Sequence, residues 1–98
     1  MIAEIVLTRE ARKDVAHAIF GYGEISSRLS ARFGEELEHV FNNISSFPDM
    51  YPLVYRNFRR ALLRKFPYSV FYVVEESFVL VVAVVHQARD ESAWKRRS

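Results

Sequence analysis

Four cations lie within seven consecutive residues in the second half of the chain, and no acid lies among them. They are Arg59, Arg60, Arg64 and Lys65, in the segment RRALLRK, and Arg56 adds a fifth just before it. Cationic groups this dense repel one another unless an anion lies between them, and arginine binds phosphate or carboxylate with two parallel hydrogen bonds. The segment therefore predicts a surface that binds an anionic partner. A solvated edge strand, kept from aggregating by its charges, is the alternative interpretation.

The distribution of charge supports an anionic partner. An extended strand would place Arg60, Leu62 and Arg64 on one face and Arg59, Ala61, Leu63 and Lys65 on the other. The net charge of +2 conceals an asymmetry: five Lys/Arg and eight Asp/Glu precede Arg56, whereas nine Lys/Arg and four Asp/Glu occur from Arg56 onward. The C-terminal half is therefore the cationic half, and its field attracts polyanions such as nucleic acid or an acidic protein.

The segment His86 to Asp90 (HQARD) is a second candidate site, because it leaves the end of a long apolar run. Side chains at the end of a rigid strand are held firmly and still reach solvent, which suits binding and catalysis. His86 could move protons near neutral pH, and Arg89 could bind a phosphate. In the alternative interpretation Arg89 pairs with Asp90 or Glu91, and His86 only ends the strand.

Several kinds of site are disfavoured by the sequence. There is no cysteine, and the three histidines lie on separate elements without the spacing of a zinc site, so we expect no metal. No glycine-rich phosphate loop and no nucleophile elbow is present. We interpret the five tyrosines mainly as core residues rather than base-stacking platforms, and Trp94 as a packing anchor for the C-terminal tail, with a partner contact as the alternative.

The first half of the chain predicts a strand followed by two helices. Residues 2–7 (IAEIVL) are short and β-branched, as strands are. Thr8 is suited to cap a helix that would end at the Gly21-Tyr22-Gly23 break, and an apolar stripe predicts a longer helix over residues 24–46. Two helices joined in this way form a hairpin with one apolar side, and that side requires a sheet.

The second half predicts that sheet. After a proline-bounded loop at residues 48–52 the apolar period becomes strand-like, in the segments LVYRNF, RRALLRKF, SVFYVVE and FVLVVAVVH. The last segment is apolar at nearly every position, which predicts an interior strand. The expected order is β-α-α-β-β-β, an α+β fold with a helical hairpin packed on a mostly antiparallel sheet, in a single domain over residues 1–98. We expect no membrane span and no secretory signal, and therefore a cytoplasmic location.

Taken together, these segments resemble a known family. The order of elements, the basic segment before FPYSVFY, the EES turn and the run VVHQARDESAW are similar to the RelE/ParE superfamily, the toxin subunits of type II toxin-antitoxin systems. The resemblance covers nearly the whole chain and is strongest from Arg59 to Trp94. It implies the superfamily's fold, no cofactor, a growth-inhibiting role associated with plasmid stabilisation, and neutralisation by a cognate antitoxin.

The resemblance implies two alternative mechanisms. RelE-like members are metal-free endoribonucleases that cut mRNA on the ribosome, whereas ParE-like members inhibit DNA gyrase. RNA cleavage requires proton carriers and a cation beside the reacting phosphate. The candidates for those roles are His86, Tyr68, Arg60, Arg64 and Arg89. Where the ribonucleases tend to place a tyrosine after the last strand this chain has Trp94, which cannot transfer a proton, and the ParE-like mechanism is therefore favoured.

The residues expected to contact partners fall into two sets. Candidates for binding the target or an anion are Arg56, Arg59, Arg60, Arg64, Lys65, Arg89 and Trp94. Candidates for binding the antitoxin, by strand addition or by a helix laid in a groove, are Met50, Tyr51 and Phe58. A nucleic-acid or protein-binding module without toxicity is the alternative outside the toxin family.

Overall fold

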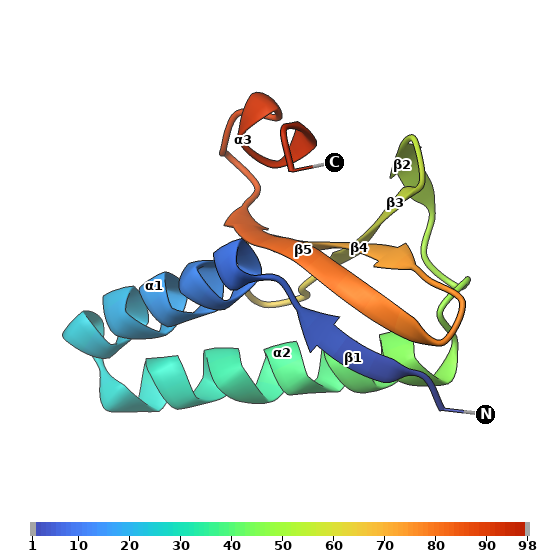
Figure 1. Cartoon of the computed structure of the whole chain (residues 1–98). Helices are drawn as coiled ribbons and strands as arrows, with labels where there is room; N and C mark the ends of the chain where they lie inside the picture. The colour runs from blue at the N-terminus through green and yellow to red at the C-terminus, as the bar shows by residue number, and fades with distance from the viewer. Residues whose placement is uncertain (1, 98) are drawn as a thin grey trace.

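The computed structural model describes residues 2–97, and its centre is a five-stranded sheet in the order β1-β5-β4-β3-β2 (Figure 1). β1 pairs with β5 in parallel, and the other neighbouring strands are antiparallel. The strands are β1 (Glu4–Leu7), β2 (Leu53–Tyr55), β3 (Phe58–Leu62), β4 (Tyr68–Val74) and β5 (Phe78–His86). The helices are α1 (Arg9–Ile25), α2 (Ser27–Ser46) and the short α3 (Ser92–Lys95).

This architecture confirms the predicted fold class, with one strand more than the predicted order. Within residues 2–97, four strands follow the helical hairpin instead of three, because a turn at Arg56 and Asn57 separates β2 from β3. β5 lies between β1 and β4, and its residues 81–85 are all buried. The prediction of an interior strand is therefore confirmed, and β5 carries the His86 segment out of the middle of the sheet.

The hairpin is formed as expected, but its turn is not at the glycines. Thr8 caps α1, because its hydroxyl accepts the Ala11 N–H at 3.1 Å. α1 continues through Gly21 and Gly23, and the break comes at Ser26, whose N–H donates to the Tyr22 carbonyl while its hydroxyl accepts the Leu29 N–H. Glycine weakens a helix by only about 1 kcal/mol relative to alanine, and Tyr22, between the two glycines, packs its ring against Phe33 and Phe66, which offsets that cost. The predicted break was therefore placed too early.

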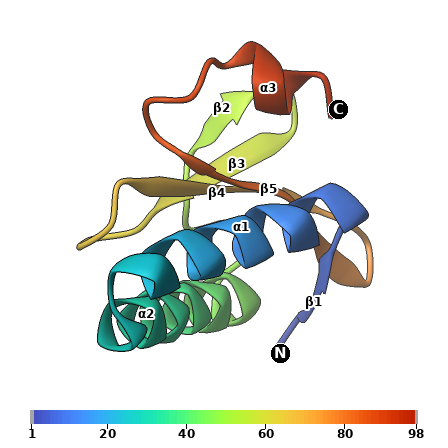
Figure 2. The same ribbon diagram turned by 90° about the vertical axis from the view of Figure 1, so that its left-hand side faces the viewer.

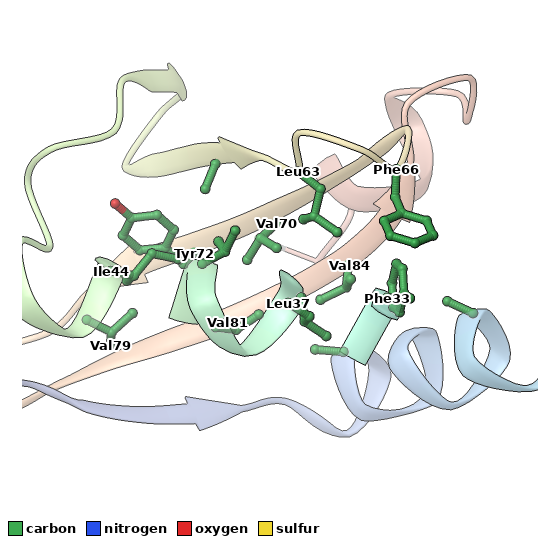
Figure 3. Close-up of a cluster of buried hydrophobic side chains, with 14 residues drawn as sticks. Phe33, Leu37, Ile44, Leu63, Phe66, Val70, Tyr72, Val79, Val81 and Val84 are labelled. Carbon is green, nitrogen blue, oxygen red and sulfur yellow. The ribbon is translucent and has the colours of Figure 1, made fainter. Parts of the chain in front are cut away.

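One face of the sheet packs on the hairpin (Figure 3). Phe33, Leu37 and Ile44 of α2 pack against β4 and β5. The side chains that the two strands contribute to this cluster are Val70, Tyr72, Val79, Val81 and Val84. The interpretation of the tyrosines as core residues is confirmed. Tyr72 is fully buried, Tyr22, Tyr51 and Tyr68 pack partly buried against this cluster, and Tyr55 packs against the cluster on the other face.

Tyr72 makes the folded state less stable at alkaline pH. Its hydroxyl donates a 2.6 Å hydrogen bond to the Pro48 carbonyl, and burial raises the pKa of Tyr72 from its ordinary value near 10 to about 12, although Arg59 opposes the shift. A group whose folded pKa is raised contributes stability that is complete below the unfolded pKa and is lost as pH rises through the folded pKa. We therefore expect the free energy of unfolding, measured with urea, to fall between pH 10 and 12. Tyr72→Phe should remove most of this dependence. An unchanged slope in the variant would contradict the assignment.

The opposite face of the sheet has its own small core, closed by α3 (Figure 2). The Trp94 indole is 5% exposed and stacks on Phe71, with ring centroids 3.9 Å apart and planes inclined by 17°. Phe58 and Tyr55 complete an aromatic group around it. The interpretation of Trp94 as a packing anchor is confirmed, and its buried indole offers no surface to a partner in this arrangement.

An ion pair holds the end of the C-terminal segment. Arg97 donates from Nη1 to Asp14 Oδ2 at 2.6 Å and from Nη2 to Asp14 Oδ1 at 3.3 Å, and also to the Val82 carbonyl at 3.0 Å. Asp14 in α1 additionally accepts the Val84 N–H at 3.0 Å. Since β1 pairs with β5 only as far as Val81, this carboxylate satisfies a backbone donor that lies beyond the end of β1.

Candidate anion-binding site

The basic segment does not form one continuous strand. β3 ends at Leu62, and Arg64 and Lys65 lie in the loop that follows. The carboxylate of Glu36 in α2 accepts the backbone N–H groups of both Arg64 and Lys65, which holds this loop against the hairpin. The prediction that strand alternation governs all seven residues is therefore wrong beyond Leu62. The cations are distributed over separate places instead of forming one surface.

Arg59 is a structural residue in this arrangement. Its guanidinium donates to the carbonyls of Asp49 at 3.2 Å and Tyr51 at 2.6 Å, and lies 3.5 Å from the Asp49 carboxylate. These contacts fasten β3 to the loop between α2 and β2. Arg59 is therefore less available to an external anion than the sequence suggested, because loop carbonyls and the Asp49 carboxylate already engage its Nη1 and Nη2 groups.

Arg64 and Lys65 line a broad, open groove of about 860 Å³ along α2. The other charged or titratable residues that line it are Arg32, Glu35, Glu36 and His39. Two acids thus face the two cations of the loop, so this groove has mixed charge. It is less suited to bind an anion than the isolated basic segment suggested.

Arg56 lies at the turn between β2 and β3. Its φ of 52° places a residue other than glycine in the left-handed region, and its guanidinium lies over the Tyr55 ring at 5.1 Å from the centroid. The side chain is exposed at the end of the sheet. Arg56 is therefore available to a partner that approaches this edge.

The remaining two candidate arginines, Arg60 and Arg89, line one depression on the sheet face that the hairpin leaves uncovered. It has a volume of about 190 Å³ and brings together β3, β4, the end of β5 and α3. Its lining consists of Arg60, Leu62, Ser69, Phe71, Val85, His86, Gln87, Arg89, Glu91 and Trp94. The structure thus unites one cation of the basic segment with the His86 segment, which the sequence had indicated as separate candidates.

Neither of the pairings considered for Arg89 occurs. Asp90 accepts the Ser92 N–H at 3.0 Å, and Glu91 pairs with Lys95 at 2.8 Å. Within residues 2–97, no carboxylate lies within 4.0 Å of the guanidinium of Arg60 or Arg89. Both arginines are thus free to bind an anion from outside the chain.

His86 is placed as a hydrogen-bond donor. Its Nδ1 accepts the Ala88 N–H at 3.0 Å, so the neutral ring carries its proton on Nε2. An Nε2–H group donates to an anion but cannot remove a proton. Gln87, which the sequence analysis included in the candidate segment without a role, lines the same depression. Nothing in the local sequence distinguishes Gln87, since glutamine on a loop is common.

Tyr68 is poorly placed to act as a base. Its ring belongs with the hairpin-side cluster, and its centroid lies 5.1 Å from that of Phe33 and 5.4 Å from that of His86, in edge-to-face arrangements. Burial raises the pKa of the Tyr68 phenol above its ordinary value near 10, and the Asp14 carboxylate adds to this shift. The phenol therefore stays protonated at neutral pH.

The three residues proposed for antitoxin contact have different surroundings. The side chain of Met50 is 53% exposed, whereas Phe58 is 2% exposed in the core beside Trp94 and is excluded as a contact in this arrangement. Tyr51 is partly buried and packs edge-on against Tyr72. The sequence analysis missed further exposed apolar side chains within four residues of Met50 along the chain, namely Phe47, Leu53 and Val54. Their position at an edge becomes visible only once β2 is known to be the last strand of the sheet.

Within the described residues, no group of three or more His, Asp or Glu side chains is arranged to hold a metal ion. In the same part of the chain, no helix has the length and apolar character needed to cross a membrane.

Comparisons with known proteins identify the family. The model of the family described as "ParE toxin of type II toxin-antitoxin system, parDE" matches residues 5–91. Among solved structures, a chain of the chromosomal ParDE toxin-antitoxin system from P. aeruginosa shares the fold, with a TM-score of 0.75 at 12% identity. The match covers 87% of this chain and 96% of that one. No curated protein matches. The family match extends over almost all of the hairpin and sheet described above, and the chain therefore belongs to the ParE toxins of type II toxin-antitoxin systems.

Proposed function

We propose that this toxin arrests growth by inhibiting DNA gyrase in the cytoplasm, and that it binds the gyrase complex through the depression lined by Arg60 and Arg89. The observation that carries the proposal is the family match over residues 5–91, which favours a ParE-like mechanism. The two arginines support it, because they face the same depression and have no acid of the described chain beside them. Such groups stabilise a complex by charge-assisted hydrogen bonds without any catalytic step.

The same depression is less suited to cleave RNA. Metal-free cleavage requires one group to remove the proton of the 2′-hydroxyl and another to protonate the leaving oxygen. His86 presents an N–H rather than a basic nitrogen, and the raised pKa of Tyr68 keeps its phenol protonated. Trp94 has no transferable proton for this chemistry. The arrangement therefore favours binding over a nuclease reaction.

The proposal is tested by inducing the toxin in cells and examining both candidate targets. Plasmid DNA should lose negative supercoils as growth stops, while the ends of cellular mRNA, mapped by primer extension, stay unchanged. Arg89→Ala should relieve the arrest, and Arg28→Ala, an equal loss of charge at an exposed position on α2, should leave it in place. Cleavage of mRNA on the ribosome with normal plasmid supercoiling would refute gyrase as the target.

We also propose that the cognate antitoxin binds at the β2 edge, defined as Phe47, Met50, Leu53, Val54 and Arg56. Four of these residues are exposed apolar side chains, and Leu53 and Val54 belong to a strand that pairs on one side only, with β3. An extended segment can add there as a further strand. Arg56 at the end of β2 and the cationic half of the chain favour a segment with acidic side chains.

Leu53→Asp tests the β2 edge. The change places a charge where an apolar partner surface would lie, so we expect antitoxin affinity, measured by calorimetry, to fall by at least tenfold while growth arrest by the unneutralised toxin persists. Ile25→Asp is the matched control, because Ile25 is 74% exposed at the far end of α1 and the same charge should do little there. Equal affinities for the two variants would place the antitoxin elsewhere.

A further inference from the structure

We infer that the depression between β3, β5 and α3 binds a backbone phosphate of duplex DNA, so that the toxin contacts the DNA held by its target as well as the target protein. This inference rests on the proposed function, which it extends by naming the ligand of the same site. Four features of the site carry it: charge, donor set, size and the state of its aromatic rings.

The charge of the depression is positive and uncompensated. Glu91 is the only acid that lines it, and this carboxylate is already paired with Lys95 at 2.8 Å. Arg60 and Arg89 come from different elements, so an anion between them would relieve their mutual repulsion. The site therefore gains most from a ligand that carries a full negative charge.

The donors of the site come from several residues, and the backbone of the segment that carries most of them is hydrogen-bonded. Besides the two guanidinium groups, His86 offers Nε2–H and Gln87 offers its side-chain amide. The Gln87 N–H donates to the Pro67 carbonyl at 2.7 Å, and the Arg89 N–H donates to the His86 carbonyl at 3.0 Å, which fixes the segment that carries them. Donors from several directions suit the tetrahedral oxygens of a phosphate better than the planar pair of a carboxylate.

The size of the site fits a phosphate, and its aromatic residues disfavour recognition of bases. A volume of about 190 Å³ accommodates a phosphate group with part of its sugar. Proteins that bind single strands stack bases on exposed aromatic rings. Here the Phe71 and Trp94 rings stack on each other at 3.9 Å, and Trp94 is 5% exposed. A site with donors but without a stacking platform matches the backbone of a duplex, whose bases are already paired.

The experiment measures binding of the purified toxin to a short fluorescein-labelled duplex DNA by anisotropy, without gyrase. We expect weak binding that does not depend on sequence, with Kd on the order of 10⁻⁴ to 10⁻⁶ M. Arg60→Ala and Arg89→Ala should each weaken it roughly tenfold and lower the slope of log Kobs against log salt by about 1. Arg28→Ala is the control, because it removes the same charge from the exposed surface of α2, outside the depression, and should leave the affinity nearly unchanged.

The fluorescence of Trp94, the single tryptophan of the chain, verifies that each variant keeps the wall of the depression. The inference is overturned if wild-type toxin does not bind duplex DNA, if Arg60→Ala and Arg28→Ala bind equally, or if single-stranded RNA is bound more tightly than the duplex. Gyrase inhibition without DNA binding would overturn this inference alone, whereas DNA binding without gyrase inhibition would support the phosphate site and overturn the proposed function.

Discussion

Trp94→Ala is expected to lower the free energy of unfolding by about 3–5 kcal/mol, as truncations of large buried aromatic residues do. The indole stacks on Phe71 and contacts the rings of Phe58 and Tyr55. Its removal therefore leaves a cavity in the small core on the sheet face opposite the hairpin. Domains of this size are stable by only about 5–15 kcal/mol, so the change removes a large share of that stability and disrupts the depression that Trp94 lines. The variant should therefore lose growth arrest. Urea denaturation followed by circular dichroism measures the loss of unfolding free energy that causes it.

Two control variants separate packing from partner contact. Trp94→Phe keeps an aromatic ring on Phe71 and should retain most of the stability and toxicity. Phe20→Ala removes a ring that is 70% exposed on α1 and should change the free energy of unfolding by less than about 0.5 kcal/mol. If Trp94→Ala lost toxicity with unchanged stability, Trp94 would be a contact to the target and the account of it as a core residue would be wrong.

Asp14→Ala is expected to cost about 3 kcal/mol, at the lower end of the range for breaking one partner of a buried ion pair. The lower end applies because Arg97 keeps 18% of its side chain exposed, whereas Asp14 keeps 9%. The change leaves the mostly buried guanidinium of Arg97 without its carboxylate partner and the Val84 N–H without an acceptor. Because α3 would lose its anchor to α1, Trp94 emission should also shift toward the red.

Glu38→Ala is the matched control for Asp14, because it removes a carboxylate from an exposed position on α2. It should leave both the unfolding midpoint and the emission of Trp94 nearly unchanged. A double-mutant cycle with Arg97→Ala then gives the coupling energy of the pair. A coupling energy near zero would show that the C-terminal segment is held by Trp94 alone.

Much of the fold could be predicted from the sequence because its signals are local. The apolar run of β5 indicates an interior strand by itself, and Thr8 is recognisable as a cap from its place before an amphipathic helix. The hairpin turn could not be placed as well, because glycine weakens a helix by only about 1 kcal/mol relative to alanine and does not end one by itself. Here α1 continues through both glycines. It ends at Ser26, which caps the end of α1 with its N–H and the start of α2 with its hydroxyl.

The site was harder to predict because its partners are distant in the sequence. That Arg60 remains free while Arg59 does not depends on Asp49 and on the loop carbonyl of Tyr51. The position of Arg64 in a loop against the hairpin depends on Glu36, 28 residues earlier in the chain, which accepts its backbone N–H. Composition and alternation reveal a cationic segment, but only the folded chain shows which of its members already have acceptors.

The most direct measurement of the central claim is a supercoiling assay with purified toxin, purified gyrase, ATP and relaxed plasmid. The account predicts that wild-type toxin blocks supercoiling and accumulates cleaved DNA, that Arg89→Ala requires at least tenfold more protein for the same effect, and that the cognate antitoxin restores supercoiling. Undiminished gyrase activity in the presence of folded wild-type toxin, together with cleavage of mRNA in a purified translation system, would contradict it.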